Sequence, residues 1–216
     1  MIEVVKFVFN PFQENTYLLY DETSECIIVD PGCSGHEEQE LLRNYIIAHG
    51  LIPVKVILTH AHVDHICGAK FLSDEYGLVP ECHKEDLGLL EQAQFHGKVL
   101  GFTIEAPPTP TRFLEEGKEL RFGNSSLQIM HVPGHSKGSV ALHSNENSFV
   151  LTGDVLFSGS IGRTDLPGGS YEVLMNSIRE KLLPMGDEVV VYAGHGPDTS
   201  ILEEKKSNPF IKQAFL

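Results

Sequence analysis

Four side chains that can bind a metal ion occur within six residues of this chain. They follow an apolar run that predicts a buried strand, and they are His60, His62, Asp64 and His65. Alternate residues of an extended segment point the same way, so His60 and His62 can be directed at one point. Asp64 and His65 then lie where the chain turns, and they can be directed at a second point nearby. Imidazole and carboxylate are suitable ligands for zinc or iron, so this segment predicts a metal site.

Three more ligand-type side chains follow predicted buried strands farther along the chain, each with glycine beside it: His135, Asp154 and His195. Glycine permits close packing and unusual backbone angles, and loops at strand ends are where functional groups concentrate. With the first cluster these residues make seven ligands, which is enough for two metal ions that share one carboxylate. The sequence therefore predicts two divalent metal ions per chain, zinc in the first place, with iron and manganese as alternatives.

The elements that must position these ligands follow from the pattern of apolar residues and turn formers. Each half of the chain predicts several strands and then a helix, and this order favours two packed sheets with helices outside. The segment 97–111 contains three prolines and predicts a surface excursion that covers the substrate. Strands are predicted at residues 3–9, 16–20, 25–29, 54–59, 78–82, 120–122, 127–132, 139–144, 149–152 and 188–193, and helices at 36–49, 64–76, 84–94 and 171–181.

Length and charge narrow the class of protein. A chain of 216 residues suits a single domain, residues 1–216, and is long enough to bury a substantial core. Acidic residues outnumber Lys and Arg by 30 to 16, which gives a formal net charge of −14. A protein that binds nucleic acid needs a basic stripe to neutralise phosphates, and the sequence shows none. We therefore expect neither a nuclease nor a nucleic-acid partner.

The same sequence predicts a cytoplasmic protein. It begins with no basic segment followed by an apolar core and a cleavage site, and no apolar run approaches the roughly 18 residues of a membrane span. Its four cysteines form no Cys-x-x-Cys pair and are too few for a disulfide scaffold. We expect no membrane partner, and the sequence leaves the oligomeric state open.

The seven ligand-type residues, in this order and spacing, resemble the metal-binding motif of the metallo-β-lactamase superfamily. The resemblance spans nearly the whole chain. It implies an α/β fold, a four-layer αββα sandwich with the site between the edges of its two sheets. It also implies that His60, His62 and His135 hold one metal ion, that Asp64, His65 and His195 hold the other, and that Asp154 bridges them.

Within that superfamily the chain is similar to the short form of glyoxalase II-like thioester hydrolases. The matching stretches are Asn15-Thr16-Tyr17, Asp30-Pro31-Gly32, Thr152-Gly153-Asp154, Gly162-Arg163-Thr164-Asp165, Gly194-His195-Gly196-Pro197-Asp198-Thr199 and Asn208-Pro209-Phe210. The resemblance implies hydrolysis of a small-molecule thioester, S-lactoylglutathione, by a hydroxide held between two metal ions, with Asp64 and Asp154 as catalytic residues. The chain departs from the pattern at Cys67, where such sequences usually carry glycine. We expect this thiol to pack rather than to face the metals.

Glutathione is anionic, so a strongly acidic protein needs local cations to bind it. Arg163 lies in the loop after one predicted metal ligand, Lys205 and Lys206 lie farther along the chain, and Tyr171 offers a hydroxyl. These four residues are the predicted substrate-binding side chains. Two alternatives stay open, since Lys205 and Lys206 can lie on a solvated helix face and Arg163 can pair with Asp165 instead.

Other functions use the same scaffold. Persulfide dioxygenases are similar to this chain, including a Gly-Arg-Thr-Asp stretch like residues 162–165, and they would use one iron held by His60 or His62, His135 and Asp154. The complete second set of ligands favours the hydrolase. A β-lactamase is disfavoured because those enzymes usually carry another residue in place of Asp154, whereas lactone hydrolysis shares the thioester chemistry. A structural metal site would be closed by four ligands and rich in cysteine, unlike this one.

Overall fold

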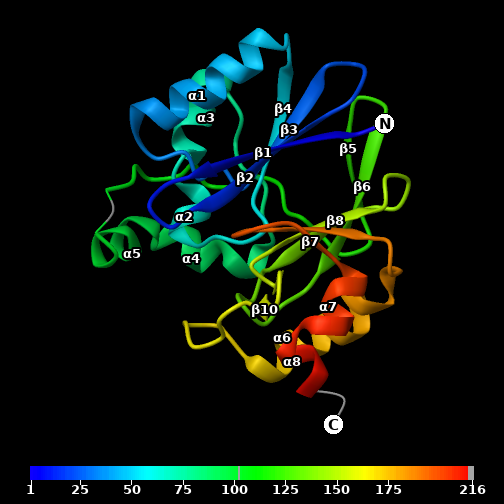
Figure 1. The fold of residues 1–216 in the computed structure, drawn as a ribbon. Helices are drawn as coiled ribbons and strands as arrows, with labels where there is room; N and C mark the ends of the chain where they lie inside the picture. The colour runs from blue at the N-terminus through cyan, green and yellow to red at the C-terminus, as the bar shows by residue number, and fades with distance from the viewer. Residues whose placement is uncertain (102, 214–216) are drawn as a thin grey trace.

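The computed structural model describes residues 1–101 and 103–213, and in it two β-sheets pack face to face with helices on both outer sides (Figure 1). The first sheet, in the order β1-β2-β3-β4, contains β1 (Glu3–Phe9), β2 (Glu14–Tyr20), β3 (Glu25–Val29) and β4 (Ile52–Ile57). The second sheet, in the order β12-β11-β8-β7-β6-β5, contains β5 (Glu119–Phe122), β6 (Ser125–His131), β7 (Val140–Ser144), β8 (Phe149–Gly153), β11 (Val190–Ala193) and β12 (Thr199–Ser200). The predicted four-layer αββα sandwich is confirmed.

The core lies between the sheets because successive residues of a strand point to opposite faces. In β3, Ile27 packs into the cluster between the sheets, whereas the next residue, Ile28, packs into the cluster under the outer helices. Tyr17 from the first sheet and Leu142 and Leu151 from the second are buried in the same central cluster as Ile27. Burial of this apolar surface holds the two sheets together.

Helices cover both outer faces. On the first sheet, α1 (Gly35–Ala48) and α3 (Ala69–Tyr76) bury Leu42, Ile46 and Leu72. The second sheet is covered by α6 (Tyr171–Ser177), η2 (Ile178–Leu182), η3 (Leu183–Met185), α7 (Ile201–Ser207) and α8 (Pro209–Gln213), which lie in the lower part of Figure 1. No helix in the described part of the chain is long and apolar enough to cross a membrane.

The predicted helix at 64–76 is interrupted. It forms α2 (Val63–Ile66) and α3, with Cys67 and Gly68 between them. Gly68 donates its N–H to the Pro31 carbonyl at 2.7 Å, and a Cβ at this position would lie 2.3 Å from the Cys33 sulfur. The break is therefore set by close approach to a loop of the first sheet.

Two other predicted segments differ. The strand predicted at 78–82 is reduced to isolated bridges at Glu81 and Cys82. The helix predicted at 84–94 is divided into η1 (Lys84–Asp86), α4 (Leu87–Glu91) and α5 (Ala93–Val99), so the predicted excursion at 97–111 begins with the end of a helix. The short pair β9 (Leu156–Phe157) and β10 (Ser160–Ile161) was not predicted.

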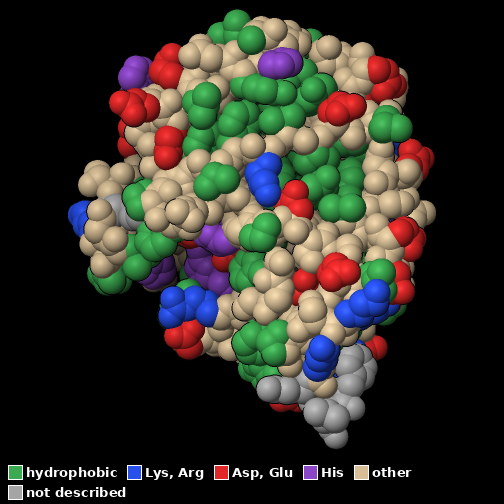
Figure 2. All heavy atoms as spheres, viewed as in Figure 1, with side chains coloured by type: hydrophobic (Ala, Val, Ile, Leu, Met, Phe, Trp, Pro, Cys, Tyr) green, Lys and Arg blue, Asp and Glu red, His purple; other side chains and the backbone are tan. Residues whose placement is uncertain are grey.

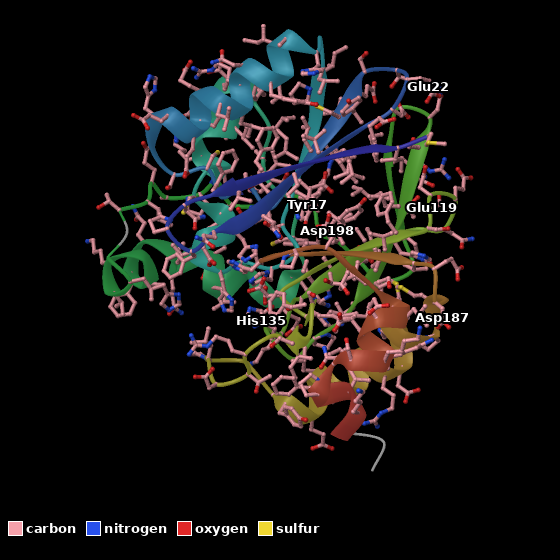
Figure 3. The ribbon with its side chains drawn as sticks, in the orientation of Figure 1. Tyr17, Glu22, Glu119, His135, Asp187 and Asp198 are labelled. Atoms are coloured by element: carbon pink, nitrogen blue, oxygen red, sulfur yellow. The ribbon has the colours of Figure 1, made fainter. Side chains whose placement is uncertain are left out.

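Polar contacts join the two sheets at the end of β11. The Tyr17 hydroxyl donates to the Ala193 carbonyl at 2.7 Å, and the Asn15 amide donates to the carbonyls of Ala193 and Gly196, both at 2.9 Å. The Asn15 N–H donates to the Gly194 carbonyl at 2.7 Å. Tyr17 lies between the two halves of the molecule in Figure 3. These bonds fix the loop after β11 against the first sheet.

Removal of the Tyr17 hydroxyl tests this connection. The Ala193 carbonyl keeps its bond from Asn15, so we expect Tyr17→Phe to lower the free energy of unfolding by about 1 kcal/mol in urea denaturation. Tyr171→Phe is the matched control, because Tyr171 is 50% exposed and we expect no change there. Equal stability of Tyr17→Phe and the parent protein would contradict the connecting role.

Candidate metal centre

The seven predicted metal ligands lie together at one edge of the sandwich. They follow β4, β6, β8 and β11 or belong to α2, and they are His60, His62, Asp64, His65, His135, Asp154 and His195. Because β8 and β11 are parallel neighbours, their ends bring Asp154 and His195 to the same edge. Figure 3 shows His135 where the two halves of the sandwich meet.

Three histidines form the first group. The Nε2 atom of His135 lies 3.2 Å from His60 Nε2 and 2.8 Å from His62 Nδ1. The outer nitrogens of two rings are oriented by oxygens, since His135 Nδ1 donates to the Arg163 carbonyl at 2.9 Å and His60 Nδ1 lies 3.2 Å from the Thr59 hydroxyl. A partner on one ring nitrogen leaves the other available to a metal ion, so this group presents three imidazole nitrogens to one point.

Burial keeps His60 and His62 of this group neutral. Desolvation and the neighbouring imidazoles hold the pKa of His60 well below its usual range, and the same two causes lower the pKa of His62 to about 3. Neutral imidazole is the form that binds metal ions. His60 and His62 therefore have the protonation state of metal ligands.

The second group contains Asp64, His65 and His195. His195 Nε2 lies 3.2 Å from both His65 Nε2 and Asp64 Oδ2. The outer nitrogens are again oriented, because His65 Nδ1 lies 3.1 Å from Asp30 Oδ2 and His195 Nδ1 donates to the Phe12 carbonyl at 3.1 Å. Inner atoms of two imidazoles and one carboxylate thus converge on a second point.

Asp154 lies between the two groups. Its Oδ1 is 3.4 Å from His65 Nε2, and its Oδ2 is 3.6 Å from both His135 Nε2 and His195 Nε2. Burial opposes ionisation of this carboxyl, but the charges of His65, His135 and His195 together outweigh burial and hold the pKa of Asp154 below its usual range. Among the described residues, no hydrogen-bond partner satisfies the buried Oδ1 atom. A carboxylate oxygen in this position fits a metal ligand, since buried polar atoms otherwise find partners.

Charge at the second group also fits a cation. Burial disfavours the charged form of His65, but the carboxylates of Asp154 and Asp64 outweigh it and hold the pKa of His65 well above its usual range. Positive charge is therefore favoured at this point, and a divalent cation would satisfy the same two carboxylates in place of that proton.

Two buried carboxylates support the ligand loops from behind. Asp30 accepts hydrogen bonds from the Thr59 N–H at 2.6 Å and the Thr59 hydroxyl at 2.5 Å. The same carboxylate lies beside the outer nitrogen of His65. Asp86 accepts from the N–H groups of Ala61 and Gly138 at 3.1 and 2.7 Å, so it joins the loop of the first cluster to the loop of His135. Asp86 was not predicted from the sequence, because nothing local to η1 distinguishes it from an ordinary acidic residue at a helix start.

A pocket of about 470 Å³ opens onto the candidate metal centre. Figure 2 shows histidine side chains in this hollow, beside hydrophobic side chains of the region around α5. Five predicted ligands line it: His62, Asp64, His135, Asp154 and His195. The remaining lining residues are Phe12, Val63, Leu89, His96, Val99, Leu100, Arg163, Leu166 and Pro167.

Of the four predicted substrate-binding residues, only Arg163 is among the described residues that line this pocket. Its guanidinium donates two hydrogen bonds to Asp165, at 2.8 and 2.7 Å, which is the alternative that the sequence left open. Lys205 pairs with Asp187, which Figure 3 shows far from His135. Lys206 and Tyr171 are exposed and lie outside the pocket lining. The residue types of Tyr171, Lys205 and Lys206 do not predict which way α6 and α7 turn these side chains.

Cys67 does not add a ligand. Its thiol donates to the Val63 carbonyl at 3.1 Å, and its side chain packs against the apolar cluster around Leu58 and Ile66. Burial raises the pKa of this thiol to about 12, which keeps it protonated. The packing role expected from the sequence agrees with these contacts.

Comparisons with known proteins give the same assignment as the geometry. A family model described as the metallo-beta-lactamase superfamily matches residues 9–195. The chain is 40% identical to the probable metallo-hydrolase YqgX of Bacillus subtilis (strain 168), over 93% of both chains. It is 38% identical to the hydroxyacylglutathione hydrolase GloC of Haemophilus influenzae, again over 93% of both chains.

Solved structures share the fold over almost their whole length. The BLEG-1 B3 metallo-beta-lactamase is 34% identical, with a TM-score of 0.88 over 98% of this chain and 99% of that chain. TTHA1623, solved in a di-iron-bound form, is 40% identical, with a TM-score of 0.87 over 96% of this chain and 100% of that chain. The predicted family is therefore confirmed: the chain belongs to the metallo-beta-lactamase superfamily.

Proposed function

We propose that this protein is a metal-dependent hydrolase that cleaves the thioester bond of a small molecule, with S-lactoylglutathione as the representative substrate. The observation that carries the proposal is the position of Asp154, whose carboxylate oxygens face both groups of imidazoles in the pocket. In this proposal His60, His62 and His135 hold one divalent ion, Asp64, His65 and His195 hold the other, and Asp154 contacts both. Zinc is the proposed metal, and the di-iron form of a similar structure supports iron as the alternative.

The surroundings of the ligands favour a thioester over an amide. A divalent metal ion, when bound, lowers the pKa of its water and polarises the carbonyl oxygen of a substrate. Although burial opposes it, His65 and His195 hold the pKa of Asp64 below its usual range, so Asp64 is ionised and has no proton to donate. The leaving group must then depart without a general acid from this residue. A thiolate can do so, because the pKa of a thiol is only about 8.5.

The relatives support the same class of reaction. One of them carries the name hydroxyacylglutathione hydrolase, and its 38% identity extends over 93% of both chains. We propose a small-molecule thioester as the substrate, neither nucleic acid nor membrane as a partner, and the cytoplasm as the location.

Hydrolysis of a β-lactam is the second candidate, because the BLEG-1 structure that resembles this chain is a metallo-beta-lactamase. That reaction expels a nitrogen, which is a much poorer leaving group than a thiolate and gains more from a proton donor. The thioester is the first proposal because a thiolate departs more readily than a nitrogen and because one relative is named hydroxyacylglutathione hydrolase. A one-iron persulfide dioxygenase, the alternative from the sequence, leaves His65 and His195 without a role.

Loss of the carboxylate between the two groups tests the proposed function. We expect Asp154→Ala to retain less than two metal ions per chain and to lower kcat/KM for S-lactoylglutathione by about 100-fold or more, beyond the effect typical of residues that merely orient ligands. Metal content is measured by mass spectrometry of the elements, and turnover by the loss of thioester absorbance. Asp187→Ala, at an exposed carboxylate paired with Lys205, is the control. Unchanged turnover in Asp154→Ala would exclude the two-metal proposal.

The position of Asp86 generates a second test. Asp86→Asn keeps the size of the side chain but replaces one acceptor oxygen by a donor, so the loops of Ala61 and Gly138 lose part of their common anchor. We expect the metal affinity of the first group to fall about 10- to 100-fold in chelator competition, with the second group little affected. Asp74→Asn, at an exposed carboxylate of α3 that pairs with Lys70, serves as the control. An unaltered affinity at both groups would show that Asp86 does not position the ligands.

A further inference from the structure

Away from the metal ligands, the pocket is bordered by an apolar wall. We define this wall by five residues from two segments: Leu89, Val99, Leu100, Leu166 and Pro167. Leu89 belongs to α4, Val99 is the last residue of α5, and Leu100 follows it directly. Leu166 and Pro167 belong to the loop after Arg163. A substrate whose carbonyl lies at the metal centre therefore shares the pocket with these apolar side chains.

The α5 helix turns one face toward the pocket. His96, Val99 and Leu100 are spaced i, i+3 and i+4, so they lie on the same face, whereas Ala93 and Gly97 are buried and anchor the helix. Val99 and Leu100 are nevertheless 70% and 53% exposed. Single exposed apolar residues are common, but these two line a pocket together with Leu89, Leu166 and Pro167. The helix thus offers uncovered apolar surface at the reaction site.

The charged side chains that line the pocket beside the wall do not favour an anionic group. Arg163 is the one Lys or Arg among the described residues that line the pocket, and Asp165 neutralises it with two hydrogen bonds in fork geometry. The nearest acids, Asp64 and Asp154, belong to the candidate metal centre. An uncharged group is therefore the best match to the wall.

We propose that the apolar wall binds the acyl chain of the substrate and that the protein prefers thioesters with apolar acyl chains longer than lactoyl. This inference rests on the proposed function and specifies its substrate class. A lactoyl group has three carbons and a hydroxyl, so it would leave much of Val99, Leu100 and Leu166 uncovered. Each added methylene that contacts the wall removes more apolar surface from water.

A series of thioesters on one thiol tests the preference. With the metal-loaded full chain, we compare lactoyl-, acetyl-, butyryl- and hexanoyl-glutathione. We expect kcat/KM to rise about three- to fourfold per methylene along the acetyl, butyryl and hexanoyl series. In Leu100→Asp and Val99→Asp, the ratio of hexanoyl to acetyl turnover should fall by at least about tenfold, since a carboxylate in the wall repels an apolar chain. Ile47→Asp, at a 67% exposed residue of α1, is the matched control with an unchanged ratio.

Binding of the free acids separates this inference from the proposed function. Acetate, butanoate and hexanoate carry the acyl chain without the thiol, and we expect their Kd, by calorimetry, to fall about three- to fourfold per methylene in the parent protein but not in Leu100→Asp. If no thioester is hydrolysed while this dependence persists, the proposed function fails and the acyl subsite stands. If thioesters are hydrolysed at rates that ignore chain length, and the acids bind equally, the subsite is overturned and the function stands.

Discussion

Five imidazoles and two carboxylates are held within a few ångströms of one another at the edge of the sandwich, and the rest of the structure depends on keeping them there. Such a set has a large desolvation cost unless opposite charges compensate it. Asp154 provides one compensation, because it faces imidazoles of both groups. The close approach of β2 to the end of β11 follows from the same requirement, since it brings His195 toward residues carried by the first sheet.

Hydrogen bonds from the ligand loops to the buried carboxylates of Asp30 and Asp86 hold these loops in fixed positions. Parallel pairing of β3 with β4 brings Asp30 beside Thr59, and Asp30 then orients His65. Asp86 joins two loops that lie far apart in the sequence. Each histidine of the site with an oriented outer nitrogen has its inner nitrogen free for a metal ion. In front of the ligands, the pocket is lined mainly by residues of α4, α5 and the loop after Arg163.

Much of this site was predictable from the sequence, because His60-x-His62 and the glycines beside Asp154 and His195 are local signals at the ends of apolar strands. The supports were not predictable. Asp86 has partners 25 and 52 residues away, so no local pattern marks it. The break before α3 depends on Gly68 meeting Cys33, which is a tertiary contact. The position of Lys205 and Lys206 outside the pocket lining was unpredictable for the same reason, because a charged residue in the sequence does not show which way its helix faces.

The proposal that follows from these seven ligands is that they bind two metal ions at once. Its most direct test is the number of metal ions per chain, measured on protein purified without chelators and then saturated with zinc and, separately, with iron(II). We expect two ions per chain for either metal; in His62→Ala, the ion of the first group should be lost and the ion of the second group retained. A stoichiometry of one at saturation in the parent protein would contradict it and would favour one-metal chemistry at the first group.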